Sequence, residues 1–549
     1  MLSLAVTTMV FTGCGNSNNS QQWQHPPFPP GMSANVDLSI YGIELDESPL
    51  AASEIEEENI PSSPSASNYL DFVENTNFSY QVVIKYTGTD AKVENTPSGV
   101  SVTKSGADLT ITSSLAGVEY ILSGNTDNGS LNINSQENVK ITLDNCHIKN
   151  PDGSAVSVSG APYTYMVLKG DNNYLEDGFI PKTTKVNENP DGDGSANYTI
   201  EDLKQQSQQM VKDAANGIKQ VKNSIKGTIF VERNLVFSGN GKLSIQCFSK
   251  TGIRADEELA FRSGNVITVR SHEGKGVSGK TAVIIYGGAL NIDTGQSNKR
   301  GISSKGILAI YGGRTIVLSA GGDKAEGIEA KGVMTINGGD IRIASSDDGV
   351  NAGEDLVVNG GRIYACSPNN DALDANGNLI INGGTVLAIG GGGPECGLDA
   401  NDEAGFNLYI NGGTVLATGA RNSIPSKKSR QNSIVYGGNI KPKDIIGIAS
   451  GDSILMAYNI CSEYGEMGCQ ILFSSELINN DGSYTVVKGL EQSTNDSYFG
   501  LTIHPTGMKT EPLEQIKSLE KPVTKVGVFH EPPHPPHGGP GMPPPPPGK

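Results

Sequence analysis

The chain has 549 residues, with 41 Lys or Arg against 59 Asp or Glu, so its formal net charge at pH 7 is −18. Glycine supplies 69 residues, 6% of residues are aromatic, and there is one Trp. The negative charge excludes an ordinary nucleic-acid-binding protein, which needs a basic face for phosphate. No apolar run reaches the roughly 18 residues that suggest a membrane-spanning helix. A chain rich in glycine and poor in aromatic residues indicates a structure with many tight turns.

The first residues predict export to the cell envelope. An apolar stretch, Leu2–Phe11, leads into Gly13 and Cys14, and this arrangement resembles a bacterial lipoprotein signal, in which the cysteine receives a lipid. We therefore expect residues 1–14 to be a signal peptide that ends at lipidated Cys14, which anchors the exported protein to a membrane of the cell envelope; the outer membrane and the cell surface are candidates, and the leaflet stays open. Phe11 stands where leucine is usual, and no Lys or Arg precedes Cys14 to form the positive region of a signal peptide, so we suspect that the true start lies upstream. The alternative is an ordinary N-terminus with a stray cysteine.

Both ends of the chain have the composition of unstructured segments. Residues 15–80 are predicted to be a flexible acidic and polar linker, because residues 31–66 carry eight acidic residues and no basic one. Residues 509–549 are predicted to be a disordered tail, since proline dominates its last part.

The middle of the sequence is a repeat. Gly-Gly pairs recur at intervals of 22 to 29 residues, and apolar residues alternate with others after each pair, which predicts strands rather than helices. Two to three short strands per repeat, with glycine at the corners, describe one coil of a parallel β-helix. A leucine-rich repeat would need its Leu/Asn consensus, and a propeller blade would need about 40 residues per unit. The pairs are Gly287-Gly288, Gly312-Gly313, Gly338-Gly339, Gly360-Gly361, Gly383-Gly384 and Gly412-Gly413.

Stacked coils lie about 4.8 Å apart, so equivalent positions of the repeat form columns. The columns expected to point inward are aliphatic or small: Ile341, Ile363, Val386 and Val415 form one, and Ile343, Ala365, Ala388 and Ala417 form another. The column before the glycine pairs ends in four asparagines, Asn337, Asn359, Asn382 and Asn411. Their amides predict a structural ladder of side-chain hydrogen bonds at the turn.

Two other columns become acidic in the later coils. One runs from Glu326 to Asp371 and the other from Glu329 to Asp399, and neither contains Lys or Arg in the acidic coils. Like charges one strand spacing apart destabilise a sheet, and burial increases the cost. Bound Ca²⁺, which takes oxygens from Asp, Glu, Asn and backbone carbonyls, is the candidate to offset this repulsion, and a solvated acidic edge with loosely held sodium is the alternative. The predicted metal ligands are Glu326, Glu329, Asp347, Asp348, Asn351, Asp371, Asp374, Asn376, Asp399, Asn401 and Asp402.

Several segments resemble the coils of a bacterial extracellular carbohydrate-binding family. In chain order they are Gly99–Lys104, Gly117–Gly124, Val139–Ile148, Gly227–Val231, Gly252–Asp256, the coils from Asp348 to Asp374, and Gln431–Val435. Each motif is short, but their order extends from Gly99 to Lys488. The resemblance implies a right-handed parallel β-helix related in shape to pectate lyases, binding of polysaccharides such as cellulose and polygalacturonate, and bound calcium.

The expected fold class is therefore all-β: a right-handed parallel β-helix with a short helical insertion and disordered termini. The carbohydrate-binding β-helix is expected over residues 81–420 and a β-rich exit region over residues 421–508. Residues 181–226 are an insertion relative to the family pattern, and apolar residues at helical spacing from Tyr198 to Lys226 predict a helix there. Its role stays open.

One outward patch combines basic and aromatic residues. We expect Asp340 to stack on Arg362 and Arg342 on Tyr364, one coil further along. The functional interpretation is a surface that binds uronate as substrate, and the structural one is a cross-strand ion pair with a cation–π contact.

Together these patterns favour non-catalytic binding of polysaccharide, either cellulose or acidic pectin-like glycans, by a calcium-stabilised β-helix at the cell envelope. The alternatives are a calcium-dependent pectate-type lyase with Arg342 or Arg362 as base, or an adhesin-like structural solenoid. The pair Asp347-Asp348 invites an inverting glycosidase, but the acids form a graded column rather than a compact group. No catalytic residue is assigned, and six cysteines beyond Cys14 leave disulfides open.

Overall fold

The computed structural model describes residues 37–51, 60–178, 225–392, 395–461, 469–479, 482–491 and 493–529. The predicted signal peptide with Cys14, most of the predicted helical insertion, and the proline-rich end of the tail lie outside these ranges. The chain forms two compact units. We call Leu45–Gly321 the N-terminal unit, and Met1–Glu44 together with Gly322–Lys549 the C-terminal unit. No helix within the described ranges is long and apolar enough to cross a membrane.

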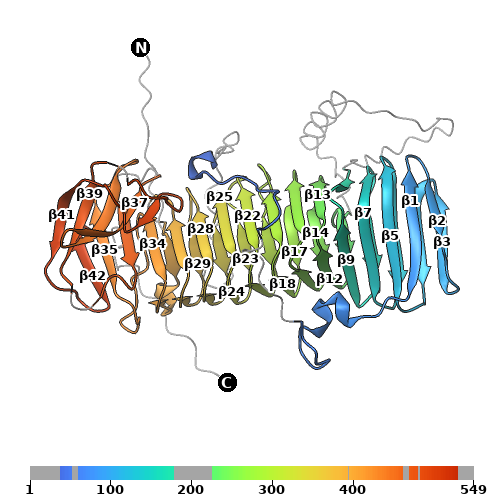
Figure 1. Cartoon of the computed structure of the whole chain (residues 1–549), viewed down its shortest axis with the longest axis horizontal. Helices are drawn as coiled ribbons and strands as arrows, with labels where there is room; N and C mark the ends of the chain where they lie inside the picture. The colour runs from blue at the N-terminus through green and yellow to red at the C-terminus, as the bar shows by residue number, and fades with distance from the viewer. Residues whose placement is uncertain are drawn as a thin grey trace, which may run out of the picture. The chain divides into compact units, whose positions relative to one another are not determined.

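The N-terminal unit is a stack of coils in which strands of successive coils pair in parallel, as Figure 1 shows. Each regular coil has three strands, so the stack has three sheet faces. Face 1 contains β4 (Ala107–Ser113), β6 (Gly129–Ser135), β8 (Val156–Ser159), β11 (Ile229–Val231), β14 (Thr251–Ala255), β17 (Lys275–Gly279) and β20 (Ile302–Ser304). Face 2 contains β1 (Tyr80–Thr87), β5 (Val118–Thr126), β7 (Val139–Asn150), β9 (Tyr163–Lys169), β12 (Asn234–Gly239), β15 (Glu258–Phe261), β18 (Ala282–Ile285) and β21 (Ile307–Ile310). Face 3 contains β10 (Asn173–Asp177), β13 (Lys242–Cys247), β16 (Val266–Ser271), β19 (Ala289–Asp293) and β22 (Arg314–Ser319).

Two antiparallel strands close the first coils of this unit. Strand β2 (Ala91–Glu94) pairs with β1, and β3 (Val100–Ser105) pairs with β4. The unit also contains two single-turn 3₁₀ helices, η3 (Tyr69–Asp71) and η4 (Val73–Asn75).

The C-terminal unit repeats the same three-stranded coil and then changes architecture (Figure 1). Its coils contain β23 (Ile328–Ala330), β24 (Met334–Ile336), β25 (Asp340–Ser345), β26 (Val350–Ala352), β27 (Leu356–Val358), β28 (Arg362–Cys366), β29 (Leu373–Ala375), β30 (Leu379–Ile381), β31 (Thr385–Ile389), β32 (Leu398–Ala400), β33 (Leu408–Ile410) and β34 (Thr414–Gly419). After them, β38 (Cys469–Ser474) pairs antiparallel with β34 and with β35 (Ser433–Gly438), which pairs with β42 (Val523–Gly527). A separate antiparallel sheet contains β36 (Ile445–Ser450), β37 (Ser453–Asn459), β39 (Tyr484–Gly489), β40 (Leu501–Ile503) and β41 (Thr510–Ile516). The unit also has two 3₁₀ turns, η1 (Ser39–Tyr41) and η5 (Asp402–Ala404). The expected all-β parallel β-helix is confirmed.

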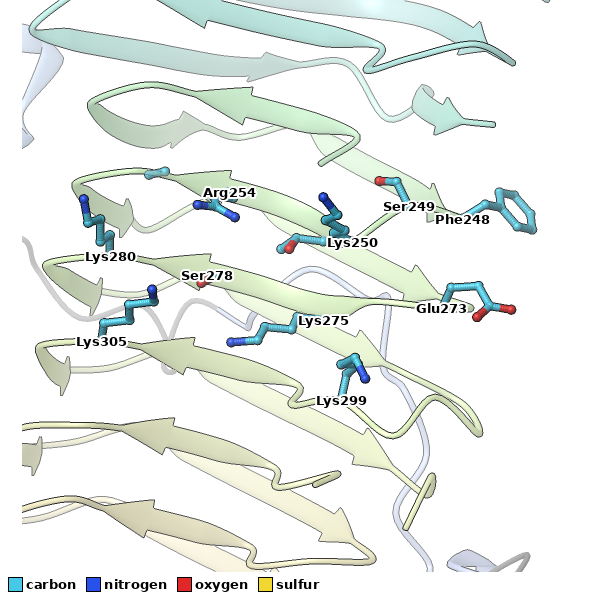
Figure 2. Close-up of a pocket in the computed structure, with 12 residues that line it drawn as sticks. Phe248, Ser249, Lys250, Arg254, Glu273, Lys275, Ser278, Lys280, Lys299 and Lys305 are labelled. Atoms are coloured by element: carbon cyan, nitrogen blue, oxygen red, sulfur yellow. The ribbon is translucent and has the colours of Figure 1, made fainter. Parts of the chain in front are cut away.

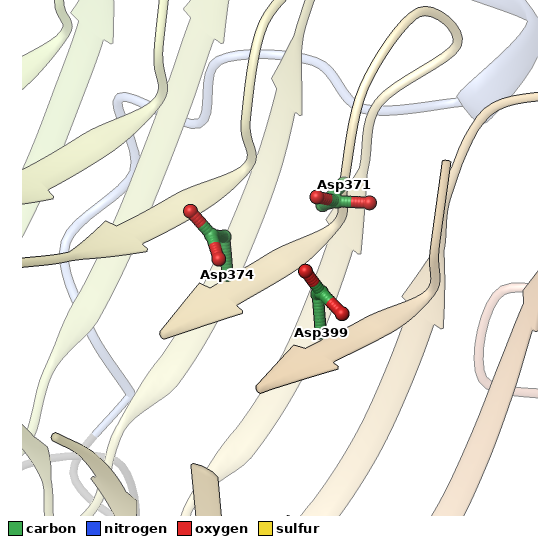
Figure 3. A group of neighbouring side chains, drawn as sticks. All are labelled: Asp371, Asp374 and Asp399. Carbon is green, nitrogen blue, oxygen red and sulfur yellow. The ribbon is translucent and has the colours of Figure 1, made fainter. Parts of the chain in front are cut away.

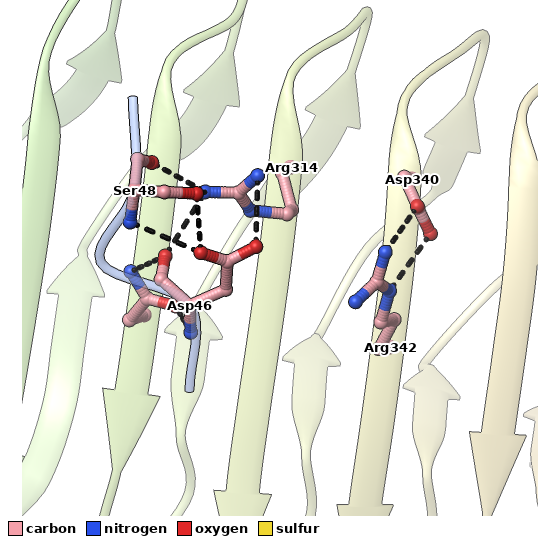
Figure 4. A network of polar contacts seen from close by, with 6 residues as sticks. Asp46, Ser48, Arg314, Asp340 and Arg342 are labelled. Carbon is pink, nitrogen blue, oxygen red and sulfur yellow. Dashed lines mark hydrogen bonds and ion pairs between the residues drawn. The ribbon is translucent and has the colours of Figure 1, made fainter. Parts of the chain in front are cut away.

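Two predicted unstructured segments are partly structured. Strands β41 and β42 lie within the predicted tail at residues 509–549 and pair with β39 and β35. Part of the predicted acidic linker lies on the outward face of the N-terminal unit, where Asp46 pairs with Arg314 at 3.1 Å (Figure 4). The acidic composition of this segment predicted a flexible linker. Its carboxylates instead pair with arginines that are far away in the sequence, and these pairs hold the segment against the coils.

The predicted inward columns have the expected register. Ile341 pairs with Ile363, which pairs with Val386, and Val386 pairs with Val415. These side chains are fully buried, as are those of the parallel column that ends at Ala417. The aliphatic columns therefore form the hydrophobic core of the coils in the C-terminal unit.

The glycine pairs have two different physical roles at the same turn. The second glycine of each pair has positive φ, for example +87° at Gly384, a conformation that residues with a Cβ rarely adopt. The first glycine allows close stacking: a Cβ on Gly383 would lie 2.8 Å from the carbonyl oxygen of Asn359 in the preceding coil. Both positions therefore require glycine, which explains why the pair recurs.

The predicted asparagine ladder is confirmed in the C-terminal unit. The Nδ2 of Asn359 donates to the Oδ1 of Asn337 at 2.8 Å, that of Asn382 to Asn359 at 2.8 Å, and that of Asn411 to Asn382 at 2.9 Å. The ladder lies on the surface, so each bond adds less stability than a buried one would.

We expect the substitution Asn382→Ala to lower the free energy of unfolding by about 1 kcal/mol, because it removes the hydrogen bonds to both neighbours. Asn411→Ala removes a single bond of the ladder and should cost about half as much. Thermal unfolding of the two variants beside the wild type checks this. Equal losses would show that the bonds do not act as a ladder.

Candidate functional site

A groove runs across face 1 of the N-terminal unit, over the three consecutive coils that contain β14, β17 and β20. Its volume is about 450 Å³. Six of the side chains that line it are basic, and Figure 2 shows how they are distributed over the strands. They are Lys250, Arg254, Lys275, Lys280, Lys299 and Lys305.

The register of the coils arranges these basic residues in two rows. Backbone hydrogen bonds place Lys280 and Lys305 at equivalent positions of successive coils, just after β17 and β20. Lys250, Lys275 and Lys299 lie near the other ends of the strands, again on successive coils (Figure 2). The floor between the rows is the outward side of the three strands.

The floor of the groove is polar and has partners of its own. The column Arg254, Ser278 and Ser303 is in register across the three strands. The Nζ of Lys275 donates to the Oγ of Ser303 at 2.9 Å, and Arg254 pairs with Asp256 at 2.6 Å. Ser278 and Arg254 thus present hydrogen-bonding atoms to the groove, whereas Ser303 is buried and bonded to Lys275 and Ser278.

An aromatic pair lies at one end of the groove. Phe248, which lines the groove, stacks on His272 of the next coil with ring centroids 4.4 Å apart and planes inclined by 10°. His272 also contacts the Oε1 of Gln246 through its Nε2 at 2.9 Å. The exposed Glu273 is the one carboxylate among the lining residues.

Sequence reasoning aligned these columns but did not identify the groove. In the sequence, Lys275 and Arg300 precede Glu326 in the same column of the repeat, and this change from basic to acidic residues was the available signal. The acidic half of that column gives the stronger signal in the sequence, because like charges one strand spacing apart require a compensating charge. Lys250, Lys280, Lys299 and Lys305 lie outside the aligned motifs, so only the folded coils bring them to one surface.

The acidic columns of the C-terminal unit are in register as predicted. Glu329, Asn351, Asp374 and Asp399 pair in sequence across β23, β26, β29 and β32. Asp371, Asp374 and Asp399 come together: one oxygen of each lies within 4.8 Å of the others (Figure 3). We call these three the acidic cluster.

The hydrogen bonds of the acidic cluster are unevenly distributed. Asp371 accepts from the backbone N–H of Cys396 at 2.5 Å, and Asp399 accepts from the Oγ of Ser423 at 3.0 Å. Within the described ranges no hydrogen bond reaches the half-buried carboxylate of Asp374. Burial and the charge of Asp399 raise the pKa of Asp374 to about 7. Burial, reinforced by the charge of Asp399, also raises the pKa of Asp371 well above its ordinary value.

Asp348 lies one coil before the cluster and is 6% exposed. Its Oδ2 accepts from the Nδ2 of Asn351 at 2.7 Å, and its Oδ1 accepts from the backbone N–H of Asp371 at 3.3 Å. Burial, followed by the charge of Asp374, raises the pKa of Asp348 well above its ordinary value. Protonation is therefore one way in which the column reduces its repulsion.

Basic residues lie at both ends of the acidic columns, which corrects the expectation that none is near. Lys331 forms an ion pair with Glu329 at one end. At the other end Arg421 forms a parallel bridge with Cys396 and lowers the pKa of Asp399 against the larger raising effect of burial. Asp371 and Asp374 lie between these two ends, and no ion pair with either is formed by a basic residue of the described ranges.

Several predicted metal ligands form hydrogen bonds that link or cap the coils. Asn376 donates to the carbonyl of Ala352 and Asn401 to that of Asn376, so these amides link successive coils. Asn401 also caps η5, whose first residue, Asp402, is exposed. Asp347 accepts from the Nδ2 of Asn370 at 2.6 Å, and Glu326, Glu329 and Asn351 are not part of the acidic cluster.

The acidic cluster fits a hard divalent cation. Three carboxylates offer oxygen ligands of the kind that Ca²⁺ prefers, and Asp374 has a carboxylate with no hydrogen-bond donor among the described residues. A cation there would favour the ionised forms that burial disfavours.

The predicted substrate surface has the expected register but is covered. Asp340 pairs with Arg362 in register and Arg342 with Tyr364. Arg342 forms its ion pair with Asp340 of its own strand, at 2.7 Å (Figure 4), and Tyr364 is 2% exposed.

The segment before β40 forms the cover. Phe499 stacks on Tyr364 with centroids 4.1 Å apart, and the guanidinium of Arg362 lies 4.2 Å from the ring centroid of Tyr498. A sugar cannot stack on Tyr364 while Phe499 occupies that face. The assignment of Tyr364 to substrate binding is corrected for this reason.

The fold and the groove define a β-solenoid with an open groove, rich in basic side chains, across three of its coils. A family model described as carbohydrate-binding domain-containing protein matches residues 105–204, 193–324 and 320–369. The matched ranges extend together from residue 105 to residue 369, and this similarity confirms the resemblance and supports polysaccharide as a partner in general terms. The groove lies within the matched residues.

The other comparisons add little. No curated protein matches the sequence. The solved structure of the polysaccharide lyase-like protein from C. thermocellum, a gadolinium derivative, is similar at 19% identity and a TM-score of 0.35, over 55% of this chain and 96% of that one. A similarity at this level carries no argument about function.

In metal-free buffer the acidic cluster should make stability fall as pH rises. Raised pKa values mean that the folded state binds protons more tightly than the unfolded state, whose Asp pKa is about 3.9. The resulting stabilisation is present below about pH 4 and is lost as pH approaches the pKa of about 7 at Asp374. We expect Asp374→Asn to raise the free energy of unfolding at pH 8 by about 1–2 kcal/mol and to flatten the slope between pH 4 and 8. Melting temperatures across this range, with Asp402→Asn as an exposed control, measure the effect. Identical slopes in both variants and the wild type would contradict it.

Proposed function

We propose that this protein binds polysaccharide without cleaving it, at the cell envelope. The observation that carries the proposal is the groove on face 1, which lies within the family-matched residues and crosses three coils. Because the groove continues over three successive coils, it suits an extended polymer better than a small compact ligand.

The chemistry of the groove suits sugars. Hydroxyls and charged groups on its floor can bond to sugar oxygens, and Phe248 offers an apolar ring face to a sugar ring. Both cellulose and acidic pectin-like glycans meet these requirements, since both are extended chains with many hydroxyl groups.

Ca²⁺ bound by Asp371, Asp374 and Asp399 would stabilise the C-terminal unit. Its positive charge would replace the protons that these carboxyls otherwise need at neutral pH. In this proposal calcium acts on the stability of the coils.

Cys14 would hold the protein at the envelope through a lipid. The proposal rests on the lipoprotein-like signal at residues 1–14. Mass spectrometry of the cysteine-containing peptide, compared with a Cys14→Ser variant, tests it.

A lyase is a weaker candidate because the residues considered as its base are engaged elsewhere. Arg342 is paired with Asp340, and Arg362 stacks on Tyr498. An adhesin-like solenoid would have no glycan ligand.

Affinity electrophoresis should show retardation of the protein in gels that contain a bound glycan. Cellulose derivatives and polygalacturonate are the first two to test. Incubation with polygalacturonate should give no rise in the absorbance of unsaturated products. Product formation would favour the lyase, and absence of retardation on a broad glycan panel would favour the adhesin.

Removal of calcium should lower the melting temperature of the wild type at pH 8. Saturating Ca²⁺ at a hundred times its Kd stabilises a folded protein by about 2.7 kcal/mol. Asp374→Asn should lose most of this response, whereas Asp402→Asn should retain it. A wild type whose melting temperature is unaffected by EDTA and by added Ca²⁺ would exclude the metal.

A further inference from the structure

A short segment ahead of the first coil packs on the outward side of face 2. It covers residues 60–79, which we call the strap, and it contains η3 and η4. Val73 and Phe78 of the strap pack against a small buried cluster on β9, β12 and β15. The members of this cluster are Tyr165, Val236 and Ala260. The strap therefore lies across successive coils of the N-terminal unit.

Polar contacts also hold the strap in place. The hydroxyl of Tyr165 donates to the carbonyl of Leu70 at 2.9 Å. Arg262, which follows β15, forms an ion pair with Glu74 at 2.6 Å, and its guanidinium lies 4.4 Å from the ring centroid of Phe72. The strap is thus bonded to residues of the coils that follow it by about a hundred positions or more.

Two carboxyl groups meet beneath the strap. Asp71 of η3 is 2% exposed, and its side chain is hydrogen-bonded to that of Glu258 at the start of β15. Two carboxylates cannot form such a bond, because neither has a proton to donate. One of the two carboxyls must therefore carry a proton while the strap is in place.

The surroundings of the pair place that proton on Glu258. Burial raises the pKa of Asp71, but the hydroxyl of Tyr286, which donates to its Oδ2 at 2.5 Å, and the charge of Arg262 lower it again. No such donor reaches the Oε1 of Glu258 among the described residues. Burial, followed by the charge of Asp71, raises the pKa of Glu258 to about 8.

The charged and titratable groups around the pair compensate a second negative charge poorly. Arg262 supplies positive charge, but it is shared with Glu74. The other groups that face the pair are three hydroxyls and one acid, and the acid is paired with Arg233: Tyr163, Tyr165, Tyr286 and Glu257. Loss of the proton from Glu258 would therefore leave two carboxylates in contact and repelling each other.

We propose that the strap is a pH-dependent clasp, closed by the proton that Asp71 and Glu258 share and released when that proton is lost. Release uncovers the outward side of face 2 and frees about 20 residues of chain ahead of β1, which span roughly 65 Å when fully extended. In the proposed function this lengthens the tether between Cys14 and the coils. The clasp itself depends neither on the lipid nor on the ligand of the groove on face 1.

The direction of the effect follows from the two pKa values of Glu258. The pKa is about 8 under the strap and about 4.3 for an exposed glutamate, so the docked state binds the proton more tightly. The contribution of this proton to docking is complete below about pH 4 and is lost as pH rises through about 8. The clasp is therefore closed in mildly acidic solution and loosens in alkaline solution.

Hydrogen exchange of the full-length chain at pH 6 and pH 9, followed by mass spectrometry, tests the clasp. After correction for intrinsic rates, peptides of the strap should exchange about tenfold faster at pH 9, whereas peptides of β13 and β16 should not change. Glu258→Gln keeps a donor to Asp71 that does not titrate, so its strap should exchange slowly at both pH values. Glu257→Gln changes the neighbouring carboxylate, which pairs with Arg233 at 3.2 Å, and should respond as the wild type does.

A second readout uses chymotrypsin, which can cleave after Tyr69 or Phe72 of the strap. At pH 8 cleavage should be faster in the wild type than in Glu258→Gln. Asp71→Asn removes the other carboxyl and should also abolish the pH response, so a folding defect in one variant leaves the other to decide.

Equal corrected exchange of the wild-type strap at pH 6 and pH 9 would overturn the proposal. A pH response in Glu258→Gln as large as that in Glu257→Gln would overturn it as well. Neither experiment contains a glycan, so their results are separate from those that test the proposed function.

Discussion

The parallel register between successive coils is the constraint on which this structure depends. Strands of neighbouring coils are held about 4.8 Å apart by backbone hydrogen bonds, so whatever occupies one position meets its equivalent in the next coil. For apolar residues such as Ile341 and Ile363 this is favourable, because each buries the other. For asparagine it is also favourable, since each amide both donates and accepts along the ladder. For glycine it permits an approach to the neighbouring carbonyl that a Cβ would prevent.

The same register is unfavourable for charge. Asp374 and Asp399 are brought into contact by the pairing that aligns Leu373 with Leu398, and neither can move away without breaking that pairing. Three features reduce this repulsion: protonation of the buried carboxyls, hydrogen bonds donated by Cys396 and Ser423, and a basic residue at each end of the acidic columns. The centre of the acidic cluster therefore favours a bound cation. The groove on face 1, with its stacked lysines, favours a bound anion.

The periodicity of the sequence made the coils and their columns of equivalent residues predictable. The glycine pairs gave the coil length, and the coil length gave the columns, including the asparagine ladder and the alignment of Glu329 through Asp399. Contacts between segments far apart in sequence were not predictable in this way. No repeat pattern indicates that Phe499 covers Tyr364, or that Asp46 in a segment of linker-like composition pairs with Arg314. The groove was not predicted either, because most of its lysines lie outside the columns that the repeat defines.

Those long-range contacts also explain why lysine rather than arginine marks the open surface. Three outward arginines are occupied by the chain itself: Arg262 pairs with Glu74 at 2.6 Å, Arg270 with Glu47 at 2.7 Å, and Arg362 stacks on Tyr498. Guanidinium groups suit such contacts because they are planar, bind carboxylates through two parallel bonds and stack on rings. Ammonium groups are strongly hydrated and remain in solvent until a counter-charge arrives. These arginine contacts help to hold each unit together, whereas Lys250, Lys280 and Lys305 form no ion pair with the described residues and leave the groove open to a ligand.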